Sequence, residues 1–371
     1  MRERIFLSPP HMSGKEQDYI AEVFKSNYIA PLGEFVTKFE QSICEYTGAS
    51  NALATVNATS AIHLALRVLG IGKDDIVLAS SFTFIGSVSS ILYQGARPYF
   101  IDSNKKSWNL SPTRLKMAIE NAPKKPKALI LTHLYGQCAD LQKIVKICKE
   151  HGIYLIEDAA ESMGALYQGR QSGTFGDIGI FSFNGNKILS TSGGGALVSQ
   201  NKAWVDKAAF YATQAKEDMP YYEHKELGYN YRMSNVLAAI GVAQMEVLSA
   251  RVDKCREIFS WYQEELKDIQ EIRFMPELEG SQGNRWLTTC IFEKTDPIRV
   301  IEALEKHNIE SRRLWKPMHL QELFKDALVE KNGVSEALFD KGVCLPSGTQ
   351  LRREDVRFIS KCIKEVVHAA L

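Results

Sequence analysis

The chain has 371 residues, 45% hydrophobic and 24% charged, and Lys+Arg of 45 against Asp+Glu of 44 leave a net charge of +1. This balance excludes the basic stripe of a nucleic-acid-binding protein and a strongly cationic membrane surface, so we expect a small molecule or another protein as partner. No apolar run is long enough to predict a signal sequence or a membrane span. The seven cysteines are scattered without CxxC pairs or Cys/His clusters, which predicts reduced thiols, no metal site and a cytoplasmic protein.

The first half of the chain alternates between strand and helix patterns. Pro9-Pro10 predicts an extended arm over residues 1–13, and apolar spacing predicts helices over 14–25 and 34–46. This alternation predicts an α/β protein with a largely parallel sheet and helices on both faces. The predicted strands are 52–56, 76–79, 98–101, 128–131 and 153–156, and the predicted helices are 57–69, 85–92 and 141–151.

The segment 178–198 reads IGIFSFNGNKILSTSGGGALV. Residues 178–183 predict a strand buried on both faces, and Lys187 follows it between apolar residues. A lysine there is costly unless its charge is paired or removed. A lysine with a lowered pKa is a free amine that can form an imine with an aldehyde. The alternative interpretation is a surface lysine beside a turn.

The second half begins with a helical pattern from Ser234 to Leu266, which predicts one long helix bridging two domains. We place the boundary near residue 250, with a large domain and arm in residues 1–250 and a smaller C-terminal α+β domain in residues 251–371. The other predicted elements are a loop at 279–284, a strand at 286–292, a helix at 297–307 and an amphipathic helix through 356–367.

Several polar side chains fall near the carboxyl ends of predicted strands, where parallel sheets bind ligands. Asp158 is a suitable partner for a protonated pyridine nitrogen, although it could also cap the next helix. Thr59 and Ser60 open a helix whose N–H groups suit a phosphate, with ordinary N-capping as the alternative. Ser182 could add a hydroxyl, and Phe84 could stack on a ring. With the lysine, this set fits pyridoxal 5′-phosphate.

The chain resembles the sugar-nucleotide aminotransferases of the DegT/StrS type over essentially its whole length. The motifs that carry the resemblance are LSPP, NATSAIHLAL, SFTFIGS, HLYGQ, EDAAE, FSFNGNK, GYNYRMSN, RRLWKPMHLQ and CLPSG. It implies the PLP-dependent aspartate-aminotransferase type I fold, with a mostly parallel sheet in the large domain. Nearest in pattern is the branch of bacillosamine-pathway UDP-sugar 4-aminotransferases, which SNYIAPLGEF, ASSFTFI, FNGNK, TSGGG and EHxxxGYNYR resemble.

The resemblance also implies roles for individual residues. Glu161 stands where relatives often carry Gln or His beside the ring, and Asn184 stands where many carry His. Asn230 would reach the phosphate from the other subunit, which implies a homodimer with its active site at the interface. The remaining positions are Lys187 as the imine-forming lysine, Asp158 at the ring nitrogen, Phe84 on the ring, and Thr59, Ser60 and Ser182 at the phosphate.

The activity implied is transfer of the amino group of L-glutamate, leaving 2-oxoglutarate, to the C4 ketone of a UDP-linked 2-acetamido-4-keto-2,6-dideoxy sugar. Asn186, Trp315 and His319 are candidate sugar-nucleotide contacts, although Trp315 and His319 equally suit a seam between domains. Two alternatives stay open. One is a 3-keto-sugar aminotransferase of the same family, and the other is a regulator that binds cofactor or sugar nucleotide without turnover.

Overall fold

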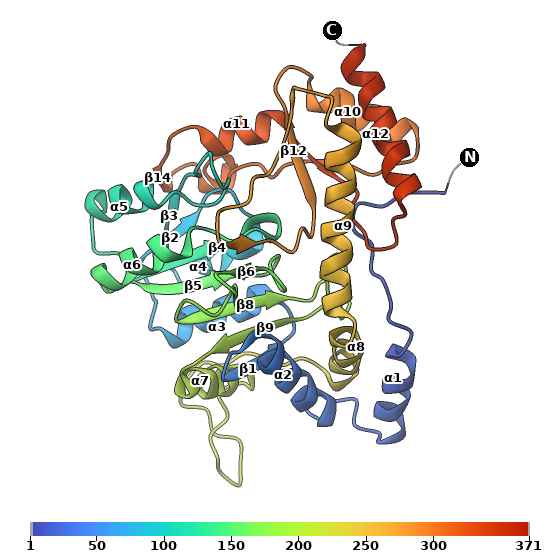
Figure 1. The fold of residues 1–371 in the computed structure, drawn as a ribbon. Helices are drawn as coiled ribbons and strands as arrows, with labels where there is room; N and C mark the ends of the chain where they lie inside the picture. Colours follow the sequence, from blue (N-terminus) through green and yellow to red (C-terminus); the bar gives the residue numbers. More distant parts are fainter. Residues whose placement is uncertain (1–2, 370–371) are drawn as a thin grey trace.

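The computed structural model describes residues 3–369 and is built around one eight-stranded sheet (Figure 1). The strand order is β1-β9-β8-β5-β4-β2-β3-β14. Every pair from β8 to β14 is parallel, whereas β9 runs antiparallel to both of its neighbours. The largely parallel sheet is therefore confirmed. Its strands are β1 (Asn51–Thr55), β2 (Ile76–Ser80), β3 (Arg97–Ile101), β4 (Ala128–Thr132), β5 (Tyr154–Asp158), β8 (Ile178–Ser182), β9 (Gly195–Ser199) and β14 (Leu328–Glu330).

Helices cover both faces of this sheet because successive residues of each buried strand point to opposite sides. Ile180 and Leu197 pack in the cluster under α3 (Ala58–Val68), α4 (Ser89–Tyr93) and α7 (Lys202–Ala212). Their neighbours Phe181 and Ala196 pack on the other face. That face is covered by α1 (Glu16–Lys25), α2 (Glu34–Thr47), α8 (Asn235–Met245), α5 (Pro112–Asn121) and α6 (Leu141–His151).

The C-terminal part forms a second, four-stranded antiparallel sheet in the order β10-β12-β15-β13. Its strands are β10 (Ile272–Phe274), β12 (Thr288–Phe292), β15 (Gly342–Leu345) and β13 (Arg312–Arg313), and the surrounding helices are α9 (Leu248–Leu266), α10 (Pro297–Lys306), α11 (Val334–Lys341) and α12 (Arg353–His368). We keep the domain boundary near residue 250 as a proposal. The small sheet lies wholly beyond it, while β14 crosses back to pair with β3.

Three predicted elements need correction. The single helix over 234–266 is two helices, α8 and α9, bent by 61°. The bend lets α8 lie close against α2, where Gly241 leaves no room for a side chain beside Phe39, while α9 runs on to the small sheet (Figure 1). The helix predicted at 85–92 is a 3-10 turn, Ile85–Ser87, followed by α4. The loop predicted at 279–284 contains β11 (Ser281–Gln282), which extends the pair β6 (Leu166–Tyr167) and β7 (Arg170–Gln171).

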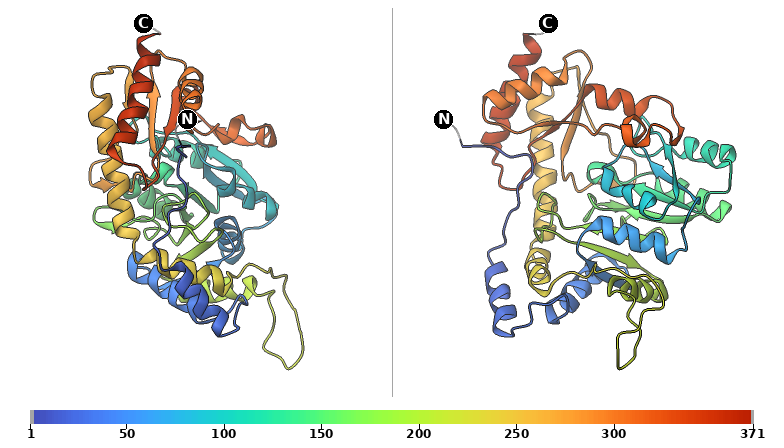
Figure 2. Two further views of the ribbon diagram at one scale, coloured as in Figure 1. Left: turned by 90° about the vertical axis from the view of Figure 1, so that its right-hand side faces the viewer. Right: turned by 180° about the vertical axis from the view of Figure 1, so that it is seen from behind.

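Two segments lie outside these layers. The N-terminal arm runs down the outside of the molecule from the small sheet to α1, and the loop between α7 and α8 projects away from the body in every view (Figure 2). Within residues 3–369, no single helix is long and apolar enough to cross a membrane, and α8 with α9 reach that threshold only as a bent pair.

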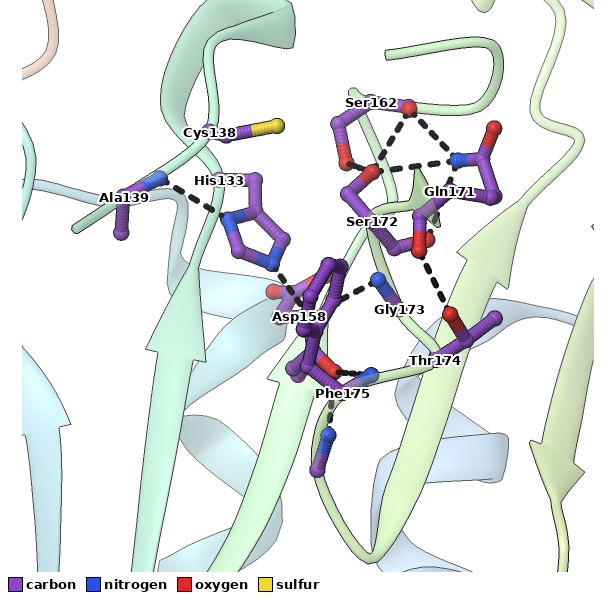
Figure 3. A network of polar contacts seen from close by, with 12 residues as sticks. His133, Cys138, Ala139, Asp158, Ser162, Gln171, Ser172, Gly173, Thr174 and Phe175 are labelled. Carbon is purple, nitrogen blue, oxygen red and sulfur yellow. Dashed lines mark hydrogen bonds and ion pairs between the residues drawn. The ribbon is translucent and has the colours of Figure 1, made fainter. Parts of the chain in front are cut away.

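The end of β5 is fixed by a buried hydrogen-bond network on the face away from α3. The Nε2 of His133 lies 2.8 Å from Glu157 Oε2, and the Nδ1 of His133 accepts the N–H of Ala139. Glu157 also accepts the N–H groups of Gly173, Phe175 and Gly176. Burial alone would raise the pKa of Glu157, but these donors hold it below its ordinary value. Figure 3 shows His133 and the segment 173–175 converging on this network.

The substitution Glu157→Ala should therefore lower the free energy of unfolding by roughly 3–5 kcal/mol, because it leaves His133 and buried N–H groups without their acceptor. Denaturant unfolding followed by circular dichroism measures this loss. As a control, Glu150→Ala on the exposed side of α6 should change it by less than about 0.5 kcal/mol. Equal stabilities of the two variants would contradict a structural role for the buried hydrogen-bond network.

Candidate active site

A cavity of about 460 Å³ opens at the carboxyl ends of β1, β2, β5 and β8, the edge where parallel sheets bind ligands. Its walls come from both parts of the chain. From the ends of the large sheet's strands and the segments that follow them come Asn57, Thr59, Phe84, Ser87, Asp158, Ala160, Glu161, Ser182, Asn184, Asn186 and Lys187. From the C-terminal part come Trp286, Leu287, Arg312, Arg313, Trp315 and Cys344. The structure thus brings eight of the predicted site residues to one cavity.

Lys187 lies in the turn after β8, where its N–H donates to the carbonyl of Asn184. Its side chain is only 12% exposed. The Nζ atom lies 4.0 Å from the centroid of the Trp286 ring and 3.7 Å from Glu161 Oε1. Burial lowers the pKa of Lys187, and the nearby carboxylates of Glu161 and Asp158 only partly offset this. The surface-lysine interpretation is therefore wrong, and the lowered pKa favours the neutral amine, which is the nucleophilic form.

Glu161 is the second unusual titratable group of the cavity. Glu161 is 4% exposed. Burial raises the pKa of Glu161 to about 7, against the lowering effect of Lys187 and of the N–H of Tyr135, which lies 2.6 Å from Oε2. Perturbed groups of this kind cluster at functional sites.

Asp158 ends β5 and points to the face opposite Glu157, into the cavity. The residue is 3% exposed, and its Oδ1 accepts the N–H of Ala160 at 3.1 Å. Turns follow it, with no helix before β6. The helix-cap interpretation of Asp158 is therefore wrong, and the carboxylate serves a turn while facing the cavity.

The α3 end of the cavity carries hydroxyl groups. Asn57, rather than a hydroxyl side chain, caps α3 by accepting the N–H of Ser60 at 2.8 Å. That leaves Thr59 at the cavity wall, with Ser182 also lining it. Ser60 is buried and is not among the lining residues, so its contact with a phosphate stays a prediction.

Two aromatic rings from different parts of the chain lie against each other in the wall of the cavity. Phe84 is 57% exposed, and its ring centroid lies 5.6 Å from that of Trp315 at an angle of 48°. The N–H of Trp315 donates to the hydroxyl of Tyr135 at 2.9 Å. Asn186 also lines the cavity, and its carbonyl accepts the indole N–H of Trp286 at 2.7 Å. An exposed flat ring such as Phe84 is suited to stacking on a ligand.

Besides Ser60, two predicted site residues are not among those that line this cavity. The side chain of His319 is 5% exposed, and its Nδ1 contacts Ser81 at 2.6 Å while Nε2 contacts Glu336 at 3.0 Å. Both ring nitrogens therefore have protein partners. Asn230 is exposed on the segment that returns from the projecting loop, where it pairs with Thr213.

Sequence reasoning missed several wall residues because the signals are long-range. Trp286, Arg312 and Arg313 come from the C-terminal part, and no local pattern links them to Lys187. Tyr135 lies within the HLYGQ motif, but its left-handed backbone (φ 51°) is visible only in the structure. The RRLW run was the one available signal for the two arginines.

The donor set fits pyridoxal phosphate. A buried amine stands at one wall, a buried carboxylate at the end of the adjacent strand, hydroxyls at the start of α3, and an exposed ring beside them. With the fold, this site defines a pyridoxal-phosphate-dependent enzyme of the aminotransferase type.

The family comparison agrees with that class. The chain belongs to the DegT/DnrJ/EryC1/StrS aminotransferase family, whose model matches residues 10–364. It is 48% identical over 376 residues, 99% of this chain and 97% of the relative, to EpsN of Bacillus subtilis strain 168, whose name assigns it to the pyridoxal phosphate-dependent aminotransferases. The chain is accordingly a pyridoxal-phosphate-dependent transaminase of the sugar-aminotransferase family.

Other relatives differ in the sugar nucleotide that their names give. The GDP-perosamine synthase of Escherichia coli O157:H7 is 35% identical over 360 residues, 96% of each chain. The UDP-4-amino-4,6-dideoxy-N-acetyl-beta-L-altrosamine transaminase of Campylobacter jejuni is 35% identical over 372 residues, 98% of this chain and 97% of the relative. A DegT DnrJ EryC1 StrS aminotransferase from Brucella abortus has a similar structure, with a TM-score of 0.89 at 27% identity and 95% coverage of both chains.

Proposed function

We propose that the protein transfers the amino group of L-glutamate to the C4 ketone of a nucleotide-linked 4-keto-6-deoxy sugar. The substrate proposed is the UDP-linked 2-acetamido sugar of a bacillosamine-type pathway. The observation that carries the proposal is the buried Lys187 amine beside Asp158 and Glu161 in a cavity of the aminotransferase fold. The Campylobacter jejuni relative, which is named for a UDP-4-amino-4,6-dideoxy sugar, supports position C4.

When bound, pyridoxal phosphate supplies an aldehyde and an electron-withdrawing ring. Lys187 would hold the aldehyde through Nζ, and the same amine, once free, would move a proton between the amino-bearing carbon and the cofactor. Asp158 would keep the ring nitrogen protonated by charge pairing. Phe84 would stack on the ring, while Thr59, Ser60 and Ser182 would bind the phosphate.

The outer cavity suits the rest of the substrate. Asn186 and Trp315 line it, and we propose that they contact the sugar nucleotide. His319 contacts Ser81 and does not line the cavity, so any effect of His319 on the sugar nucleotide would be indirect. A 3-keto-sugar specificity remains the second candidate, because the same residues would serve either ketone position.

Incubation with ¹⁵N-glutamate and keto-sugar nucleotides tests the function. We expect ¹⁵N on C4 of the sugar by NMR, with a higher kcat/KM for the UDP-linked 2-acetamido sugar than for a GDP-linked 4-keto sugar. Label on C3 would select the second candidate. Absence of transfer to all keto sugars from purified, cofactor-loaded protein would favour a binding protein without turnover.

We also propose a homodimer in which Asn230 completes the partner's site. Its exposure and its absence from the cavity of its own chain support this arrangement. Each site would then combine Lys187 of one chain with Asn230 of the other.

Mixing two inactive variants tests the shared site. Lys187→Ala and Asn230→Ala, unfolded and refolded together at equal ratio, should form about half heterodimers, each with one intact site, and restore roughly a quarter of wild-type activity. If Asn230 served its own chain, every mixed site would keep one lesion. A mixture that has exchanged subunits but stays at the mean activity of its parents would remove Asn230 from the partner's site.

A further inference from the structure

Glu161 is held beside Lys187 by hydrogen bonds from two other segments of the chain. Its carbonyl accepts the side-chain N–H of Asn284 at 2.8 Å, and its Oε2 accepts the N–H of Tyr135 at 2.6 Å. The other oxygen, Oε1, is the one nearest to Lys187 Nζ, at 3.7 Å. One carboxylate oxygen is thus fixed by the backbone, and the other is directed to the amine.

The backbone that fixes Glu161 is itself unusual. Tyr135 is fully buried and has left-handed dihedral angles, φ 51° and ψ 27°. Such a conformation is unfavourable for a bulky residue and persists only where the surroundings impose it, which is typical of functional sites. The next residue, Gly136, is also left-handed, and a Cβ there would collide with Asn284. These contacts hold the N–H of Tyr135 on Glu161.

We propose that Glu161 is the proton acceptor of Lys187. A side-chain rotation that brings Oε1 from 3.7 Å to hydrogen-bond distance of Nζ lets the two side chains share one proton at neutral pH. In the transfer, one N–H bond of the Lys187 ammonium breaks, the electron pair stays on Nζ, and the proton forms an O–H bond with Oε1 of Glu161. The amine becomes nucleophilic without losing a proton to bulk water. This inference rests on the proposed function, in which Lys187 must react as a free amine.

Burial explains why a shared proton is favourable. Two separated charges are costly in the interior, so the tautomer with a neutral amine and a neutral carboxyl gains on the ion pair. Burial lowers the pKa of Lys187 and raises that of Glu161 to about 7, so both shifts favour the uncharged forms of the two groups. Groups coupled in this way titrate as a pair rather than singly.

The other titratable groups around Glu161 are less suited to the role. Cys344 has its pKa raised to about 12 by burial, and burial raises the pKa of Tyr135 well above its ordinary value. The Oδ1 of Asp158 accepts the N–H of Ala160, and this carboxylate faces the part of the cavity assigned to the ring nitrogen. Glu161 is the carboxyl whose pKa lies near neutrality beside Nζ.

Competitive labelling of the full chain, stripped of cofactor, tests the shared proton without measuring activity. Trace acetic anhydride is added at pH values from 5 to 11, and acetylation of Lys187 relative to an amino-acid standard is read by mass spectrometry. The wild type should gain reactivity in two steps. The first, near pH 7, reports loss of one proton from the pair, and the second reports loss of the shared proton.

The variant Glu161→Gln should lose the lower step and show a single transition. Its amide oxygen can still accept the N–H of Tyr135, so the fold of this region is retained. Glu310→Gln is the matched control, because Glu310 pairs with Arg312, which lines the cavity, and is not itself among the lining residues. This control should keep both steps.

A single transition in the wild type, or two unchanged steps in Glu161→Gln, would overturn the shared proton. Neither result would bear on amino transfer itself, which the ¹⁵N experiment decides. If transfer fails but the two steps are found, the proton pair stands and the proposed function falls.

Discussion

Lys187→Ala should reduce turnover of the keto sugar at least ~10³-fold, because the site loses both its covalent attachment group and the amine that moves the proton. Cofactor binding should survive in part, since Asp158, Thr59 and Ser182 remain in the cavity. Single-turnover kinetics with glutamate and then with keto sugar measure the loss in each half-reaction.

The matched control is Lys146→Ala, which removes a lysine that is 75% exposed on α6. Turnover of this variant should stay within about twofold of the wild type, because surface substitutions away from the site have small effects. Retention of most activity in Lys187→Ala would mean that another group performs the chemistry, whatever the geometry of the cavity.

The second large effect is expected for Asp158→Asn. The amide keeps the shape of the side chain, and its oxygen can still accept the N–H of Ala160. It cannot hold a proton on a ring nitrogen by charge pairing, so the electron-withdrawing ring is weakened. We expect kcat to fall by roughly 10²–10³-fold, with a smaller loss of pyridoxal phosphate affinity. Steady-state kinetics measures the loss of kcat, and titration with pyridoxal phosphate measures the loss of cofactor affinity.

Asp140→Asn provides the comparison for the same chemical change. Asp140 caps α6 by accepting the N–H of Lys143, and it is not among the residues that line the cavity. The Asp140→Asn substitution should lower the free energy of unfolding but leave kcat nearly unchanged. If Asp158→Asn and Asp140→Asn had the same kcat, Asp158 would be only a turn-capping residue.

Local signals in the sequence predicted much of the site. The apolar strands ending at Asp158 and Ser182, and the helix opening at Ala58, placed their polar residues at one edge of the sheet, because parallel strands end together. Lys187 followed from the same logic, since it comes directly after β8. The periodicity of apolar residues indicates which strands are buried and where they end, and this determines which side chains can lie close together.

The features that could not be predicted from the sequence depend on packing between distant segments. The break between α8 and α9 carries no proline, and it arises because α8 must lie against α2 while α9 reaches the small sheet. For His319 the sequence left a sugar-nucleotide contact and a seam between domains open, and the contacts of its ring nitrogens with Ser81 and Glu336 are visible only in the structure. The wall formed by Trp286 and Arg312 likewise depends on how the two sheets come together.

The most direct measurement is to reduce the purified, cofactor-loaded protein with borohydride and map the modified peptide by mass spectrometry. Reduction fixes pyridoxal phosphate to whichever lysine carries it. The account predicts one phosphopyridoxyl group per chain, on Lys187, and none in Lys187→Ala. A phosphopyridoxyl group on any other lysine of the wild type, or none despite bound cofactor, would contradict it.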